Sequence, residues 1–175
     1  MRGTMMDYPL TLQHFLERSH RMYPNKEVTT KTATGMHRYT DADFYARVHR
    51  LANALADLGV RKGDRVATFA WNHYRHLELY FAVPCMGAVL HTLNIRLFPD
   101  QLAYVINHAE DKIIFADATL LPLLQKVQAQ IKKVARFVVM TDPSAPLRAG
   151  SGQAPETTLS AIASAIEWIN SARWV

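Results

Sequence analysis

Two histidines three positions apart, His73 and His76, are the first residues here whose types and spacing could do chemistry. Residues three apart on a helix share a face, and two imidazoles on one face could bind a metal ion. No cysteine or carboxylate at ligand spacing completes the set, because Glu78 points elsewhere on the helix. The pattern therefore indicates histidines at a helix start or on the surface, and we expect no metal site.

Two more polar residues accompany the apolar run "AVLHTLN", residues 88–94. For His91 the favoured interpretation is a buried imidazole hydrogen-bonded to a backbone carbonyl, and the alternative is a residue that lines a pocket. Arg96 follows the run directly, and open α/β sheets bind ligands beyond the carboxyl ends of their strands. From the residues alone, a surface arginine paired with Asp100 is the favoured interpretation of Arg96, and the ligand contact is the alternative.

The remaining candidates favour structural roles. Glu110, Asp111 and Asp117 lie where elements are expected to end, so caps and turns account for them, and His108 suits a helix C-terminus. The sequence contains neither a G-x-S-x-G elbow nor a G-x-x-x-x-G-K-[ST] loop. The turn "AWNHYRH" has no glycine, so its backbone cannot approach a pyrophosphate as dinucleotide-binding turns do. We expect no catalytic residue in this chain.

Alternating strands and helices must position these side chains. Apolar, β-rich runs alternate with helical patterns, which predicts a parallel sheet covered on both faces. Asn72 is the expected N-cap of the first helix of this series, and Pro84 is expected to kink or end its last turn. The expected strands are 65–70, 88–94, 112–117 and 135–141, and the expected helices are 72–87, 99–110 and 119–131.

Three further elements precede this series. Leu12, Phe15, Leu16, Ser19 and Met22 form one stripe of a helix over 11–22, and "KEVTTKTATGMHRYT" predicts a hairpin. The clearest helix starts after Thr40 and ends at Gly59. The predicted fold class is α/β: a Rossmann-like layered parallel sheet with helices on both faces, preceded by a helix and a β-hairpin.

The composition is that of an ordinary globular domain. The chain has 175 residues, 49% hydrophobic and 20% charged, with a formal net charge of +5. The basic residues are scattered rather than interleaved with aromatic side chains, so we expect no nucleic-acid partner. Cys85 is expected to be a small buried hydrophobe. The longest uncharged apolar run, 79–90, is too short to cross a bilayer, and we expect a soluble, cytoplasmic protein.

Three stretches carry a resemblance to a known family: "YTDADFYARVHRLANALADLGVRKGDRVA", "ELYFAVPCMGAVLHTLNIRL" and "AYVINHAEDKIIFAD". Their order and spacing resemble the N-terminal region of the adenylate-forming acyl-CoA synthetases, from about residue 10 to residue 142. The form "GAVLHTLNIRLFPDQLAYVINHAEDK" is most similar to the branch that acts on medium- and long-chain fatty acids.

This resemblance implies a two-step reaction in full-length relatives: a fatty-acid carboxylate attacks the α-phosphate of Mg-ATP, and coenzyme A then displaces AMP. ATP, Mg²⁺ and CoA are expected for the full-length family, and none is expected to bind this chain tightly. Arg96 in "NIRL" matches an arginine on the CoA entry side, although Ile95 replaces the proline of many relatives. Trp71, Asn72 and His91 are candidate pocket residues, by position near strand ends only.

The expected domain organisation follows from the same resemblance. Residues 1–141 would form part of the N-terminal subdomain, 142–157 a linker, and 158–175 an atypical tail that could be helical. The family's phosphate loop and its Tyr-Gly-x-Thr-Glu motif do not occur in this sequence, so we expect no catalysis by this chain alone. The alternative is a non-catalytic dimerisation or interaction module derived from such a ligase, able to self-associate through apolar faces.

Overall fold

A computed structural model describes residues 8–32 and 35–141, and the predicted linker and tail lie outside this range. The elements along the chain are α1 (Leu12–Met22), β1 (Glu27–Lys31), β2 (Met36–Thr40), α2 (Asp41–Asp57), β3 (Arg65–Phe69), α3 (Tyr74–Cys85), β4 (Val89–Thr92), α4 (Pro99–Ala109), β5 (Ile113–Asp117), the 3₁₀ turn η1 (Ala118–Leu120), α5 (Leu121–Gln125), the 3₁₀ turn η2 (Gln128–Gln130) and β6 (Arg136–Met140).

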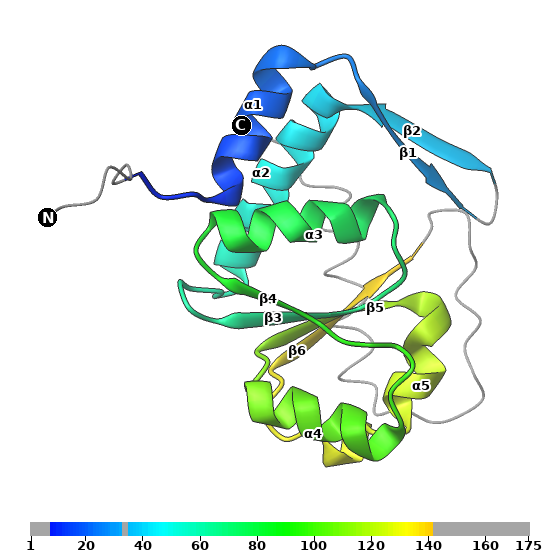
Figure 1. The fold of residues 1–175 in the computed structure, drawn as a ribbon. Coiled ribbons are helices and arrows are strands. Elements are labelled where there is room, and N and C mark those ends of the chain that lie inside the picture. The colour runs from blue at the N-terminus through cyan, green and yellow to red at the C-terminus, as the bar shows by residue number, and fades with distance from the viewer. Residues whose placement is uncertain (1–7, 33–34, 142–175) are drawn as a thin grey trace, which may run out of the picture.

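The central feature is a four-stranded parallel sheet in the order β4-β3-β5-β6, which confirms the predicted fold class. From β3 the chain moves first to β4 on one side, and then across to β5 on the other side. Because such crossovers are right-handed, the reversal of direction places the connecting helices on opposite faces. Figure 1 shows α3 above the sheet, together with α1 and α2, and α4 and α5 below it.

Each face of the sheet has its own hydrophobic core, because successive residues of a strand point to opposite faces. Val66, Ile113 and Phe115 pack with residues of α2 and α3, whereas Ala67 and Ile114 pack with residues of α4 and α5. All five residues of β5 are buried. Burial on both faces explains why these strands read as continuous apolar runs.

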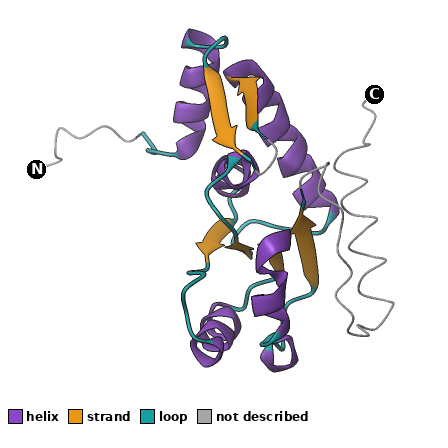
Figure 2. Ribbon diagram, turned by 90° about the vertical axis from the view of Figure 1, so that its right-hand side faces the viewer, coloured by secondary structure: helices purple, strands orange, loops and turns teal. Residues whose placement is uncertain are grey.

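The hairpin of β1 and β2 is antiparallel and separate from the main sheet, as predicted. In Figure 2 the two sheets are separated by α3, which is seen end-on. The predicted cap of α2 is confirmed: the Thr40 hydroxyl accepts from the Asp43 backbone N–H, and the Asp43 carboxylate accepts from the Thr40 N–H. Gly59 follows the helix with φ 85°, a conformation that suits glycine.

The helix predicted over 119–131 is broken into η1, α5 and η2, so that prediction was wrong in its extent. Pro122 lies in the first turn of α5, where its missing N–H costs no helical hydrogen bond, so it marks the start of this five-residue helix. The tighter turns still bury Leu120, Leu124 and Val127 against the sheet. The apolar periodicity of the sequence therefore reflects burial against the sheet, which these residues achieve without a continuous helix.

The predicted apolar stripe of α1 is mostly uncovered by the residues that the structure describes. Leu16 is buried, but Leu12, Phe15 and Met22 are 41%, 65% and 51% exposed. The helix packs on α2 and α3 through one side, where Ser19 Oγ donates to Asp41 Oδ1. Pro84 lies in the last turn of α3, which ends at Cys85, as predicted. No helix in the described ranges is long and apolar enough to cross a membrane.

Candidate functional site

The candidate site is the edge of the sheet at the carboxyl ends of its strands. The chain leaves β3 toward α3 above the sheet, whereas it leaves the neighbouring strands β4 and β5 toward helices below. Open α/β sheets bind ligands at such reversals, because adjacent loops separate there. The Leu93 N–H donates to the Thr68 carbonyl at 2.8 Å, so the loops after β3 and β4 start side by side.

Trp71 lies in the loop after β3 and is held at three points. Its backbone N–H donates to Asp117 Oδ2 at 3.0 Å, and its indole Nε1–H donates to Thr119 Oγ1 at 3.1 Å. Its carbonyl oxygen lies 3.2 Å from His76 Nδ1. The ring nevertheless remains 51% exposed, and Asn72 beside it is also exposed. The loop therefore presents a fixed aromatic ring and an amide side chain to its surroundings.

His73, rather than Asn72, is the N-cap of α3, so the predicted cap was wrong by one residue. His73 Nδ1 accepts from the His76 backbone N–H at 3.2 Å, and its Nε2 lies 2.9 Å from Asp117 Oδ2. Asp117, at the end of the adjacent strand β5, favours His73 over Asn72 as the cap, because its carboxylate orients the imidazole toward the helix. The expectation of a helix-start histidine is confirmed for His73, whereas His76 is buried rather than on the surface.

Asp117 is more than the turn former that the sequence indicated. It is 8% exposed and accepts from both the Trp71 N–H and the His73 ring. Burial by itself would raise the pKa of Asp117, but these two hydrogen bonds favour the carboxylate and lower the pKa below its ordinary value. The charged form of Asp117 is thus part of the folded structure.

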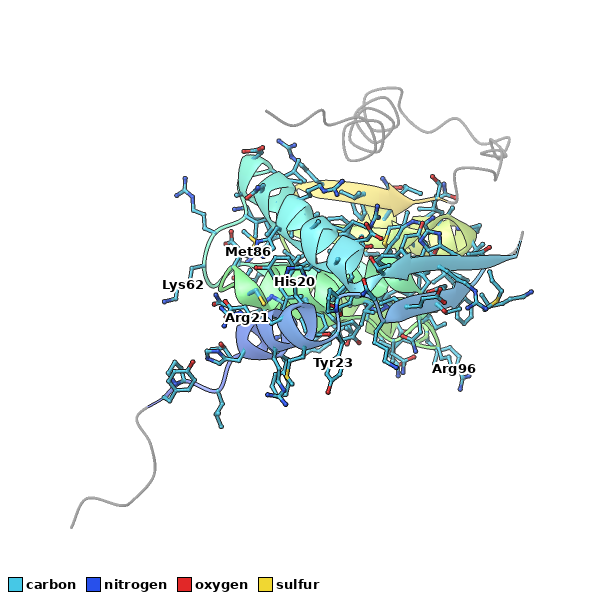
Figure 3. The ribbon with its side chains drawn as sticks, turned by 90° about the horizontal axis from the view of Figure 1, so that it is seen from above. His20, Arg21, Tyr23, Lys62, Met86 and Arg96 are labelled. Carbon is cyan, nitrogen blue, oxygen red and sulfur yellow. The ribbon has the colours of Figure 1, made fainter. Side chains whose placement is uncertain are left out.

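Arg96 leaves the loop after β4 and is exposed. Its backbone N–H donates to Asn94 Oδ1 at 2.9 Å, an Asx-type turn that fixes the backbone while leaving the guanidinium at the surface. Figure 3 shows Arg96 directed away from the ribbon. Within the ranges 8–32 and 35–141 no ion pair joins Arg96 to Asp100, so the predicted surface pairing is not present.

His91 lies apart from Trp71 and Asn72, and its predicted carbonyl partner was wrong. Its Nδ1 lies 2.9 Å from both carboxylate oxygens of Asp111, which precedes β5 and is therefore at the opposite, amino end of the sheet. The imidazole is 28% exposed because β4 is an edge strand, whereas Asp111 is fully buried. Asp111 is consequently a hydrogen-bond partner of His91 rather than a cap, while Glu110 does end α4 in a left-handed conformation.

Cys85 lines a hollow of about 130 Å³ between α1, α2 and α3, and is half-buried rather than buried. Burial raises the pKa of the Cys85 thiol, and Glu17 raises it further. The thiol therefore stays protonated at neutral pH and is a poor nucleophile. In the described part of the chain, no group of three or more His, Cys, Asp and Glu residues could hold a metal ion.

The two imidazoles at the carboxyl edge are fully engaged in holding the structure. Both ring nitrogens of His73 and of His76 already have partners, so neither imidazole is free to act as a base. The sequence did not reveal the pairing of His73 with Asp117. The signal that could have predicted this pairing is position. His73 follows β3 and Asp117 ends the adjacent strand β5, and parallel strands bring their carboxyl ends to one edge of the sheet.

The fold is an open α/β domain with a parallel sheet, an architecture in which ligands bind beyond the carboxyl ends of the strands. The sequence pattern of the AMP-binding enzymes matches residues 16–165, and the chain belongs to this family. It is 54% identical over 145 residues to a long-chain-fatty-acid–CoA ligase of Thermus thermophilus, covering 82% of this chain and 27% of the relative. It is 41% identical over 141 residues to a medium-chain-fatty-acid–CoA ligase of Ectopseudomonas oleovorans, covering 80% and 26%.

A solved structure of a related enzyme domain has the same fold. The inhibitor-bound N-terminal domain of FACL13 from Mycobacterium tuberculosis matches with a TM-score of 0.72 over 93% of this chain and 36% of that one, at 22% identity. This match shows the fold alone. The chain spans about a quarter of the length of the curated relatives. The resemblance to acyl-CoA synthetases is thereby confirmed, and the match is to their N-terminal part.

Proposed function

We propose that this chain is the N-terminal part of a fatty-acid–CoA ligase, which forms an acyl-adenylate from ATP and then a thioester with CoA. The observation that carries the proposal is the 54% identity to a long-chain-fatty-acid–CoA ligase across most of this chain. Fatty acid, ATP and CoA would be the substrates of the complete enzyme, and Mg²⁺ would accompany ATP. The described residues offer no cluster for a metal ion, so other parts of such an enzyme would hold it.

Within such a ligase this part would act as a supporting wall. The bonds of His73, His76 and Asp117 fix the carboxyl edge, and the exposed Trp71 and Asn72 would face the rest of the enzyme or its substrates. Polypeptide beyond this sequence would supply the phosphate loop and the reacting groups. The chain alone would therefore neither catalyse adenylation nor bind the nucleotides tightly.

Arg96 would contact a CoA phosphate. Its guanidinium is exposed, its backbone is fixed by Asn94, and no ion pair with Asp100 neutralises it within the described residues. A permanently charged planar donor at a ligand-binding edge suits phosphate oxygens. CoA would enter only in the second step, so loss of Arg96 would weaken thioester formation without preventing adenylation.

A chimera tests this proposal. Residues 8–141 would replace the matching segment of the Thermus thermophilus ligase, and acyl-CoA formation and pyrophosphate exchange would be measured separately. We expect both reactions in the chimera and neither in the isolated chain. Arg96→Ala in the chimera should raise the KM for CoA roughly tenfold with little change in pyrophosphate exchange. Lys126→Ala, at an exposed position directly after α5, is the matched control.

Different results would contradict the different parts of the proposal. A folded chimera without adenylation would contradict the ligase assignment, whereas robust pyrophosphate exchange by the isolated chain would contradict its inactivity. An unchanged KM for CoA in Arg96→Ala would contradict the phosphate contact alone.

A second candidate, a non-catalytic dimerisation or interaction module, is favoured by the uncovered stripe of α1. Leu12, Phe15 and Met22 expose apolar surface that soluble monomers usually cover. Sizing chromatography of the chain, alone and mixed with a full-length relative, separates the candidates. A monomer at all concentrations that does not co-elute with the relative would contradict the module.

A further inference from the structure

The two histidines at the start of α3 are fixed in opposite tautomers by their partners. A backbone N–H can only donate, so His73 Nδ1 must accept from His76 and carry no proton. The proton of neutral His73 is therefore on Nε2, which donates to Asp117 Oδ2 at 2.9 Å.

The opposite holds for His76. A carbonyl oxygen can only accept, so His76 Nδ1 must carry the proton that it donates to the Trp71 carbonyl at 3.2 Å. Its Nε2 then accepts from the Thr68 hydroxyl at 2.9 Å. The buried imidazole of His76 is thus satisfied only while it is neutral, and burial lowers its pKa.

The turn that carries Trp71 depends on both rings. The Trp71 N–H is held by Asp117, and the Trp71 carbonyl is held by His76. His76 is in turn positioned by the first turn of α3, which His73 caps. The cap is therefore connected through three hydrogen bonds to the exposed ring at the carboxyl edge.

We propose that His73 is a proton-sensitive latch, whose neutral form caps α3 and fixes the Trp71 turn, and whose protonated form releases the cap. A proton added to Nδ1 would face the His76 N–H, so two donors would oppose each other and the capping bond would be lost. The bond from Nε2 to Asp117 would remain, because a carboxylate attracts an imidazolium. The first turn of α3 is released while the ring stays beside Asp117.

Charged and titratable groups from several elements lie around His73. Arg75 and Tyr74 belong to α3, His37 on β2 stacks on Tyr74, and the Arg47–Glu78 pair lies farther along the helix. Asp117 is the group that accepts from the His73 ring, and its pKa is lowered, so it remains a carboxylate while imidazoles titrate. Burial lowers the pKa of His76, which favours its neutral form.

Amide hydrogen exchange of the full 175-residue chain at about pH 7.5 and about pH 5.5, corrected for intrinsic rates, tests the latch. The amides of residues 74–77 should lose protection roughly fivefold or more at the lower pH, relative to those of β5. In His73→Asn this pH response should disappear, because an asparagine oxygen caps a helix at any pH. The exposed His108→Gln on α4 is the matched control and should retain the response.

Nitrogen NMR of the imidazoles provides a readout that does not depend on any variant folding. At neutral pH, His73 should show the Nε2–H tautomer and His76 the Nδ1–H tautomer. The reverse tautomer in His73 would overturn the proposal. So would protection of residues 74–77 that does not change with pH, or that changes equally in His73→Asn. The latch is independent of ligase activity, so these outcomes do not bear on the proposed function.

Discussion

Glu78 is buried between α2, α3 and β2, and its carboxylate accepts hydrogen bonds from two side chains. Its side chain is 6% exposed, and it accepts from Arg47 Nε at 2.6 Å, Arg47 Nη2 at 3.2 Å and the Tyr39 hydroxyl at 3.2 Å. Burial raises the pKa of Tyr39, and the charge of Glu78 raises it further. The phenol therefore keeps its proton and remains a donor to Glu78 at neutral pH.

Glu78→Ala should destabilise the chain, because it leaves the Arg47 guanidinium and the Tyr39 hydroxyl without their acceptor. Arg47 is 38% exposed and can be partly solvated, so we expect a loss of about 2 kcal/mol in the free energy of unfolding, measured with urea. The exposed pair of Arg38 and Glu27 supplies the control, and Glu27→Ala should cost under about 0.5 kcal/mol. Equal losses would contradict the importance of burial.

Asp111 provides the second residue-scale prediction, because burial raises its pKa while the His91 ring partly opposes the shift. The folded state thus binds a proton more readily than the unfolded state. Asp111 accordingly favours folding most at acidic pH, and this contribution declines as pH rises from the ordinary value of 3.8 through the raised pKa. Asparagine keeps an acceptor for His91 but has no such decline.

The measurement is the difference in free energy of unfolding between Asp111→Asn and the unchanged chain, at several pH values between about 4 and 7. The variant should gain relative stability as pH rises, since it escapes the cost of a buried charge. Taking the difference cancels the contributions of Asp117 and of the histidines that do not contact Asp111, whereas that of His91 does not cancel. A difference that is constant or falls with pH would contradict the assignment.

At the scale of elements, the N-terminus of α2 shows what a local pattern can specify. Thr40 Oγ1 accepts from the Asp43 N–H at 3.2 Å, and this is the bond that the order of residues predicted. Thr40→Ala should reduce the free energy of unfolding by about 1 kcal/mol, measured by thermal or urea denaturation. Thr40→Ser keeps the hydroxyl and should retain most of the stability. Similar losses in both variants would point to the methyl group instead.

Whether an element depends on nearby or on distant residues explains which elements could be predicted from the sequence. The parallel sheet, the hairpin and the α2 cap depend on periodicity or on residues within one helical turn, so the sequence was sufficient. The cap of α3 was assigned to Asn72 because the partner of His73, Asp117, lies 44 positions away along the chain. His91 and Asp111 are likewise brought together by the crossover of α4. The geometry of the site depends on contacts between residues far apart in the sequence, and these contacts cannot be inferred from any one segment.

For the whole molecule, the stripe of α1 indicates how the chain should behave in solution. Leu12, Phe15 and Met22 cover little of the core, whereas neighbouring Leu16 is 3% exposed and packs on α2 and α3. We therefore expect the chain to bind a hydrophobic dye and to self-associate as its concentration rises. Among the described residues this stripe is the candidate cause, because helices cover both faces of the parallel sheet.

Phe15→Glu separates this surface from the core. Its side chain is 65% exposed, so the substitution should change the free energy of unfolding by less than about 0.5 kcal/mol while reducing dye binding and shifting the sizing profile toward monomer. Leu16→Ala is the matched control on the same helix, and it should cost about 3 kcal/mol, because it opens a cavity beneath α1. If Phe15→Glu left dye binding and association unchanged, some surface other than α1 would hold the copies together, and the stripe could not support the interaction module.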